Sequence, residues 1–222
     1  MKYAFLAAAT ALLVLAGRPE FDLAAASLFY AGDGHFIGNE PAGIIARDAA
    51  RLAPLLLFAG LLLLYIGRRL GLVAASHAPD RRSMLFLVLS LALGPGLLVD
   101  GVLKDHMHRP RPVQIHEFGG RLSFEPFYYA SGSCRRNCSF PSGETAAAFW
   151  TMAPASLAPL PMRPLLVGLA LVFGLATGGL RMAFGGHFLS DVLCAGLLTL
   201  ALIGMLRRLL RLSTPPPQNT SS

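Results

Sequence analysis

The sequence predicts an all-α membrane protein with six transmembrane helices. Of its 222 residues, 54% are hydrophobic and only 14% are charged, whereas soluble globular chains carry about 25% charged residues. The mean hydropathy of +0.56 points the same way. So few polar residues cannot cover a soluble protein of this length, which excludes a cytoplasmic enzyme, a secreted disulfide scaffold and a disordered chain.

Six apolar runs are the candidate transmembrane helices. A helix that crosses the roughly 30 Å hydrocarbon core needs about 20 residues, and backbone groups in that core must find partners within the helix. The first run could instead be a cleaved signal peptide, because Lys2 precedes it. Pro154 and Pro159 predict that the fourth helix is kinked or lies among the others. The runs cover residues 3–17, 49–67, 84–103, 145–160, 164–180 and 188–206.

The distribution of Lys and Arg between the runs predicts the orientation. One set of connections, with both chain ends, carries nine basic residues and the single acid Asp80, a net charge of +8. The opposite set carries ten basic and eleven acidic residues, a net charge of −1. We therefore expect both termini in the cytoplasm and the loop 104–144 in the periplasm. The total charge of +7 is then a topology signal, and nucleic acid is not an expected partner.

The organisation expected outside the runs is simple. Residues 1–212 should form one membrane domain whose outer loop, 104–144, carries part of the functional site, and residues 213–222 should be a disordered tail. Residues 21–30 are typical of a short helix on the outer surface. Cys134 and Cys138 should form a disulfide in the oxidising periplasm, because the further ligands that zinc needs are not evident.

Three clusters of polar residues lie at the ends of predicted helices on the outer side, in residues 104–112, 140–145 and 181–191. They bring three fixed cations and a helix N-terminus to one membrane face. Arginine presents a planar fork that matches phosphate oxygens, and free N–H groups at a helix N-terminus bind anions. We therefore predict a site for a phosphoryl group. Its expected ligands are Lys104, Arg111, Ser142, Gly143 and Arg181.

His187 and Asp191 are four residues apart at the start of a helix, so their side chains should lie on one face. We expect Asp191 to accept a hydrogen bond from one imidazole nitrogen, which leaves the lone pair on the other. A neutral imidazole beside three cations is a nucleophile for phosphorus. Catalysis would then form a phosphohistidine that water hydrolyses. No carboxylate cluster of metal-ligand type is evident, so no metal or other cofactor is expected.

These motifs together resemble those of the type 2 phosphatidic acid phosphatase family, which includes vanadium haloperoxidases and bacterial acid phosphatases. The resemblance implies that His187 is the nucleophile and Asp191 its partner. Three motifs in this order and at these spacings make a specific match. The motifs are Lys104 with Arg111 and Pro112, then Pro141, Ser142 and Gly143, then Arg181, His187 and Asp191.

Glu144 departs from the family pattern, in which a histidine at this place protonates the leaving group. A carboxyl group can donate a proton only if its pKa is raised by burial or a nearby anion, whereas nearby cations lower it. Glu144 is therefore a candidate catalytic acid with open alternatives. It could position water, pair with an arginine, select the head group or serve only as a first-turn helix acid, and His106 or His108 could supply the proton.

The expected function is a lipid phosphate phosphatase of the bacterial inner membrane, with its site facing the periplasm. The loop with cysteines followed by Ser142-Gly143-Glu144 resembles bacterial lipid A phosphatases, particularly those acting at the 4′ position, so lipid A or a related glycolipid is the expected substrate. Undecaprenyl diphosphate and phosphatidylglycerophosphate are alternative substrates, and phosphate transfer to a lipid is an alternative reaction. A non-catalytic anionic lipid binder or transporter is the alternative from another class, although ionisable groups here avoid the span interiors. The expected partners are the substrate lipid and the bilayer; the sequence does not indicate an oligomeric state.

Overall fold

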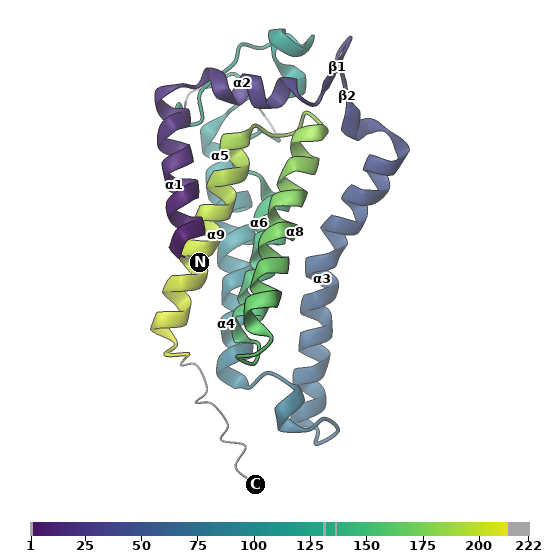
Figure 1. Cartoon of the computed structure of the whole chain (residues 1–222), viewed down its shortest axis with the longest axis vertical. Coiled ribbons are helices and arrows are strands. Elements are labelled where there is room, and N and C mark those ends of the chain that lie inside the picture. The colour runs from purple at the N-terminus through teal and green to yellow at the C-terminus, as the bar shows by residue number, and fades with distance from the viewer. Residues whose placement is uncertain (1, 131, 136, 213–222) are drawn as a thin grey trace.

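The computed structural model is a bundle of helices aligned with its long axis, with connecting loops and short elements gathered at one end (Figure 1). It describes residues 2–130, 132–135 and 137–212, and of residues 2–5, 100, 104 and 105 the backbone alone. The predicted tail, 213–222, lies outside the described residues. The helices are α1 (Lys2–Gly17), α2 (Glu20–Ser27), α3 (Pro41–Arg69), α4 (Arg81–Leu91), α5 (Lys104–Met107), α6 (Gly143–Trp150), α7 (Met152–Leu157), α8 (Arg163–Ala183) and α9 (Leu189–Leu209).

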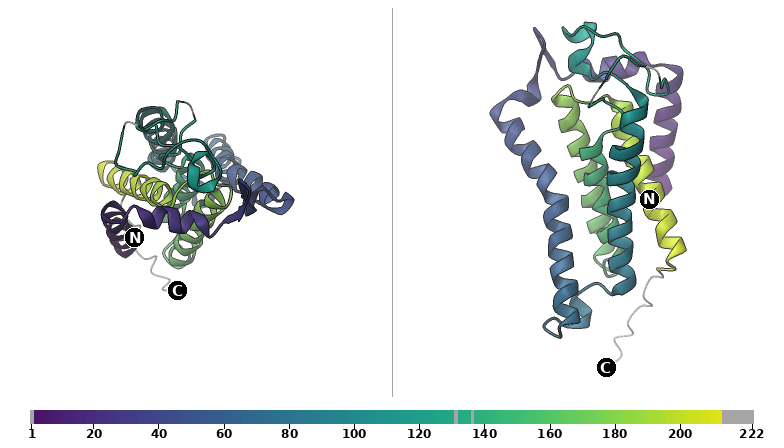
Figure 2. Two further views of the ribbon diagram at one scale, coloured as in Figure 1. Left: turned by 90° about the horizontal axis from the view of Figure 1, so that it is seen from above. Right: turned by 180° about the vertical axis from the view of Figure 1, so that it is seen from behind.

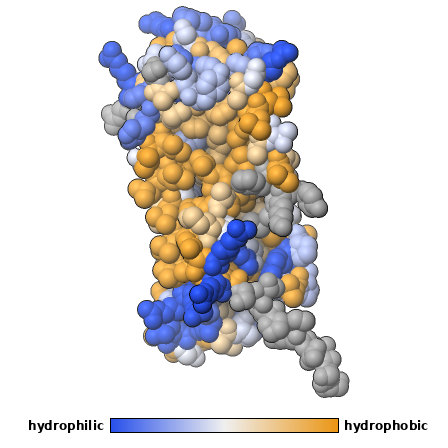
Figure 3. Space-filling model, turned by 90° about the vertical axis from the view of Figure 1, so that its left-hand side faces the viewer, coloured by the Kyte–Doolittle hydropathy of each residue, from blue (hydrophilic) through white to orange (hydrophobic). Residues whose placement is uncertain are grey.

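The described residues include four helical stretches that are long and apolar enough to cross a membrane. α1 is apolar but has only 16 residues, and α6 and α7 are shorter still. A belt of apolar side chains lies between two hydrophilic ends of the molecule (Figure 3), as expected of a chain that crosses a bilayer. The four stretches are Pro41–Arg69, Ala75–Leu103, Arg163–Ala183 and Leu189–Leu209.

The fourth predicted helix is broken and lies inside the bundle, as its prolines indicated. α6 ends at Trp150 and α7 begins at Met152, because Pro154 has no N–H to donate and its ring opposes the preceding turn. Trp150 is fully buried and donates through Nε1 to Oγ of Ser90, on α4, at 2.9 Å. This pair anchors the inner helix to its neighbour without leaving a buried polar group unpaired.

The third run is less regular than the α-helix we predicted for it. After α4 the chain is π-helical over Ala92–Leu103. Pro95 cannot donate a hydrogen bond to the carbonyl of Leu91, and Gly94 and Gly96 on either side of it have weak helix propensity. The wider π-helical turn accommodates this interruption and leads into α5, at the end of the molecule where the polar clusters gather.

α2 lies at this same end. Beside it in the chain is a β-hairpin that was not expected from the sequence. α2 confirms a short helix in the segment expected over residues 21–30, although it runs over Glu20–Ser27 and Tyr30 already belongs to the hairpin. The hairpin pairs β1 (Tyr30–Gly32) with β2 (His35–Phe36), and its turn residues Asp33 and Gly34 both have positive φ, the conformation that an Asp-Gly turn favours. Beneath these elements is a small aromatic-rich core that holds the loops in place, formed by Ala26, Phe36, Ile115, Phe118 and Phe188.

Two views place α3 at the edge of the bundle (Figures 1 and 2). It begins at Pro41, a favoured first helical residue, eight residues before the predicted run. Most of its apolar stretch is exposed, which suits a surface that faces lipid. The extra turns at its start bring Arg47 to the end of the bundle where the polar clusters lie.

Candidate active site

The loop between α8 and α9 carries His187 and passes close to Arg181. Gly185 has φ +61 and lies against the Phe36 ring, so a side chain there would be both strained and blocked. A Cβ added to Gly186 would lie 2.9 Å from Nη2 of Arg181. Two glycines in this turn therefore allow the backbone to pass close to the guanidinium group on the last turn of α8.

The tautomer of His187 is set by a backbone carbonyl. The ring is almost fully buried, and Nδ1 donates to the carbonyl oxygen of Ser139 at 2.6 Å. Oδ2 of Asp191 is 3.7 Å from Nδ1, which is beyond hydrogen-bond distance. The direct bond that we expected from His187 to Asp191 is therefore replaced by one to Ser139. With the proton on Nδ1, the lone pair is on Nε2.

Asp191 accepts its hydrogen bonds from donors other than His187. Oδ1 accepts from Nη1 of Arg109 at 2.5 Å, and Oδ2 accepts from Oγ of Ser139 at 2.5 Å and from the backbone N–H of Phe188 at 2.8 Å. Three donors, one of them charged, hold the buried carboxylate ionised. Ser139 thus bonds both residues, and Asp191 acts on His187 through Ser139 and through its charge.

The imidazole of His187 is held in its neutral form. Burial lowers its pKa below the ordinary histidine value of 6.5, and the charges of Arg181 and Arg111 lower the pKa further, while Asp191 raises it. At neutral pH the ring is uncharged, which is the state that a nitrogen nucleophile requires. Gly186, next to His187, lies close to Nη2 of Arg181, and Arg111 acts on the ring through its charge.

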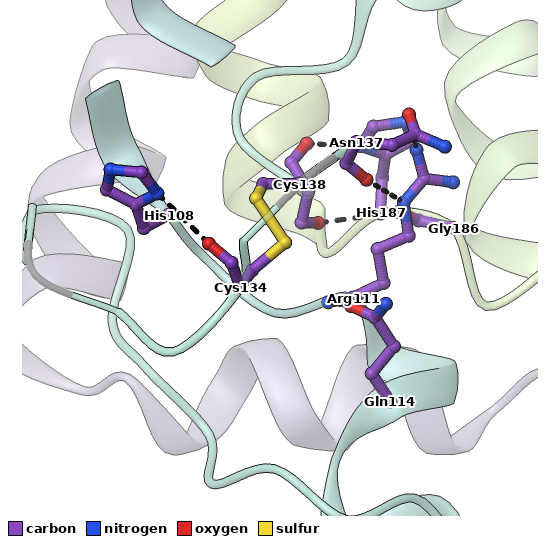
Figure 4. The surroundings of a disulfide bond; sticks show 9 residues. His108, Arg111, Gln114, Cys134, Asn137, Cys138, Gly186 and His187 are labelled. Atoms are coloured by element: carbon purple, nitrogen blue, oxygen red, sulfur yellow. Dashed lines mark hydrogen bonds between the residues drawn. A yellow bond between two sulfur atoms is a disulfide. The ribbon is translucent and has the colours of Figure 1, made fainter. Parts of the chain in front are cut away.

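Arg111 is fixed by the loop that contains the two cysteines. Nε and Nη2 donate to the backbone and side-chain oxygens of Asn137 at 2.8 and 2.7 Å. Cys134 and Cys138 form the predicted disulfide, with Cα atoms 5.7 Å apart. Figure 4 shows Arg111, Asn137 and His187 on the same side of this bridge. The disulfide therefore closes the short loop that orients one of the expected phosphate ligands.

Ser142 and Gly143 lie at the start of α6, as predicted. Ser142 is the N-cap residue and is fully buried, with its hydroxyl 2.7 Å from Oγ1 of Thr145. Its backbone N–H points to the carbonyl of Asp191 at 3.4 Å, so this turn packs against the start of α9. Lys104 begins α5, and its side chain lies outside the described residues.

Glu144 pairs with an arginine from another helix. Nη2 and Nε of Arg47, on α3, donate to its two carboxylate oxygens at 2.7 and 3.2 Å. Nε of Arg181 is 3.5 Å from Oε2. Two guanidinium groups favour the ionised carboxylate, which has no proton to give. Of the roles considered for Glu144, pairing with an arginine and a place in the first turn of a helix are both observed, and the geometry disfavours proton donation.

The two other candidate proton donors are engaged elsewhere. Nδ1 of His106 is 2.6 Å from the carbonyl of Val102, and this side chain is exposed. Nδ1 of His108 is 3.0 Å from the carbonyl of Cys134, and Figure 4 shows His108 on the far side of the disulfide from His187. Neither histidine is brought to His187 as a partner. Among the described side chains, no group of three or more His, Cys, Asp or Glu could hold a metal ion.

A buried ion network behind the site was missed by the sequence analysis. Arg109 is fully buried and donates to Asp191, to Ser190 and to Asp22 on α2, at 2.5, 2.8 and 2.9 Å. Its guanidinium lies 4.3 Å from the centre of the Phe188 ring. The one available signal was Asp22 itself, a carboxylate in a short apolar segment. The network ties α2 to the carboxylate beside His187.

Comparison with known proteins identifies relatives of this chain. The family model described as the PAP2 superfamily matches residues 83–214. A protein of Francisella tularensis subsp. novicida named lipid A 4′-phosphatase is 34% identical over 182 residues, 81% of each chain. Proteins of the same name from Rhizobium etli and Rhizobium leguminosarum are 41% and 39% identical over 133 residues, which is 60% of this chain and 52% and 57% of theirs. No solved structure matches.

Proposed function

The chain belongs to the PAP2 superfamily, and from this premise we propose that it is a membrane phosphatase that removes the 4′-phosphate of lipid A. The relatives named above support the substrate. The observation that carries the reaction is the state of His187, a buried and neutral imidazole with its proton on Nδ1, within reach of two arginine charges. This is the arrangement of a nucleophile for phosphorus.

In the proposed reaction, Nε2 of His187 attacks phosphorus, an N–P bond forms, the bond from phosphorus to the sugar oxygen breaks, and the sugar oxygen takes a proton from solvent. Water then attacks the phosphohistidine, the N–P bond breaks, inorganic phosphate leaves and the proton that this water gives up passes to solvent. Arg111, Arg181 and the first N–H groups of α6 bind the phosphoryl oxygens in both steps, with Lys104 and Ser142 as further ligands. Asp191 keeps the ring oriented through Ser139, and its negative charge stabilises the positive charge that the ring acquires.

For the topology we propose six spans in one domain of residues 1–212, in a bacterial inner membrane. α1 and the broken pair α6–α7 would be the two spans beyond the four long apolar stretches. Both termini would lie in the cytoplasm and the His187 site at the periplasmic face. The charge asymmetry between the two sets of connections supports this orientation.

The substrate is tested by incubating the purified protein with single lipid phosphates and measuring the inorganic phosphate released. We expect lipid A to lose one phosphate, and tandem mass spectrometry to locate the loss at the 4′ position. Undecaprenyl diphosphate and phosphatidylglycerophosphate serve as competing substrates. Faster release from either of them, or loss of the 1-phosphate instead, would reject the proposed specificity.

The lowered pKa of His187 predicts the acidic side of the pH profile. A nucleophile must be neutral, so kcat/KM should fall only when the pH drops through a pKa below 6.5. Rates measured over a pH series in detergent micelles test this expectation. The phosphate group of the substrate also titrates, so the series is repeated with a diphosphate substrate. If the acidic fall in kcat/KM then moves to another pH, it reports the ionisation of the substrate; if it stays, it reports an ionisation of the enzyme. An enzyme limb at or above 6.5 contradicts the assignment.

A further inference from the structure

We propose that Arg47 is a further phosphate-binding residue of this site, and that Glu144 is its internal counter-ion, which sets how strongly the site holds a phosphate group. The inference deepens the proposed phosphatase function and rests on it for the identity of the substrate. It also gives a physical role to the residue at which this chain departs from the pattern of its family.

The position of Arg47 connects it to two parts of the site. Its two donors bind Glu144, the second residue of α6, across 97 positions of sequence. Its guanidinium lies 5.3 Å from the centre of the Phe184 ring, and Phe184 opens the loop that carries His187. The side chain remains about one third exposed, so a ligand that approaches from the end of the bundle can reach it.

Glu144 lies between two arginines and satisfies only one of them. The carboxylate forms a two-pronged pair with Arg47, whereas Nε of Arg181 is 3.5 Å away. That nitrogen is buried and lacks a hydrogen-bond partner among the described residues. A buried donor without a partner costs free energy, and a phosphate oxygen could accept a hydrogen bond from it. The unsatisfied donor therefore points to an anionic ligand beside Glu144.

The balance of charge matches a phosphate monoester. Three guanidinium groups, those of Arg47, Arg111 and Arg181, act on one another here, and Glu144 is the one carboxylate that pairs directly with members of this group in the described structure. Burial lowers the pKa of Arg111, Asp191 raises it, and Arg47 lowers it again, so these cations repel. Counted without Lys104, these four groups carry a net charge of +2, which attracts a monoester of charge about −1.5 to −2. Without Glu144 the same groups would hold phosphate more tightly and release the product more slowly.

Binding of inorganic phosphate to the purified protein, measured by calorimetry, tests the inference without any turnover. We expect Glu144→Gln to tighten phosphate binding about tenfold and Arg47→Gln to weaken it about tenfold, the scale of one charge-assisted hydrogen bond. The double variant Arg47→Gln/Glu144→Gln should return to within about threefold of the wild type. Arg51→Gln is the matched control, because Arg51 lies one turn further along α3 and is exposed.

Kinetics with lipid A separate this role from proton donation. A counter-ion predicts that Glu144→Gln lowers kcat and strengthens inhibition by phosphate, and that the double variant recovers part of the rate. A general acid predicts instead an unchanged phosphate affinity and a double variant no faster than Glu144→Gln. That second pattern, or phosphate affinities unchanged in all variants, overturns the inference. Tight phosphate binding by a wild type that hydrolyses no lipid phosphate would reject the proposed function and leave the inference standing.

Discussion

Replacing His187 by asparagine is expected to reduce phosphate release from lipid A by at least about a thousandfold, because the variant lacks a nucleophilic nitrogen. The asparagine amide can still donate to the Ser139 carbonyl as Nδ1 does in the wild type. The buried loop should therefore keep its structure, and the loss should be one of chemistry. Phosphate release by wild type and variant, each reconstituted at equal amounts, measures the effect.

Two controls accompany this variant. His116 is exposed in the loop 104–144, so His116→Asn should retain the wild-type rate. The thermal unfolding midpoint of His187→Asn should stay close to that of the wild type. A folded His187→Asn protein that keeps more than about a tenth of the activity would exclude His187 as the nucleophile.

Replacing Arg109 by methionine should give the largest loss of stability. Arg109 is fully buried between Asp22 and Asp191, and its removal leaves two buried carboxylates without their cation. Breaking a buried ion pair from one side costs about 3–5 kcal/mol. We expect a clear fall in the unfolding midpoint in detergent, together with a loss of activity, because Asp191 loses the donor that fixes it behind His187.

The matched control is Arg121→Met, since Arg121 is an exposed arginine of the same loop, 104–144. Its removal should change the unfolding midpoint little. The unfolding midpoint of Asp22→Asn should lie between those of Arg109→Met and Arg121→Met, because this change removes one anion and keeps Arg109 paired with Asp191. An Arg109→Met protein as stable as Arg121→Met would mean that the network contributes little to the fold.

Features that depend on residues close together in the chain were predicted from the sequence. Apolar runs located the long helices, Pro154 predicted the break in the fourth one, and the spacing of Cys134 and Cys138 predicted the disulfide. The offsets between Arg181, His187 and Asp191 correctly predicted that these residues lie where one helix ends and the next begins, at the junction of α8 and α9. Each of these inferences uses residues close together in the chain, where helix geometry and bilayer thickness limit the outcomes.

The missed contacts join distant parts of the chain. The pair of Arg47 and Glu144 spans 97 positions and that of Asp22 and Arg109 spans 87, and neither spacing nor periodicity reports such distances. The hydrogen-bond acceptor for Nδ1 of His187 differs from the expected one for a related reason. A separation of four residues favours contact with Asp191, but the carbonyl of Ser139, 48 positions away, offers the better hydrogen bond. Tertiary packing decided these choices.

The stereochemical course at phosphorus tests the central claim most directly. A lipid A analogue with an isotopically chiral 4′-thiophosphate is hydrolysed by the wild-type protein in isotopically labelled water, and the configuration of the released thiophosphate is determined. Two successive in-line displacements, through a phosphohistidine at His187, predict overall retention of configuration. Inversion would mean a single attack by water and would contradict the account.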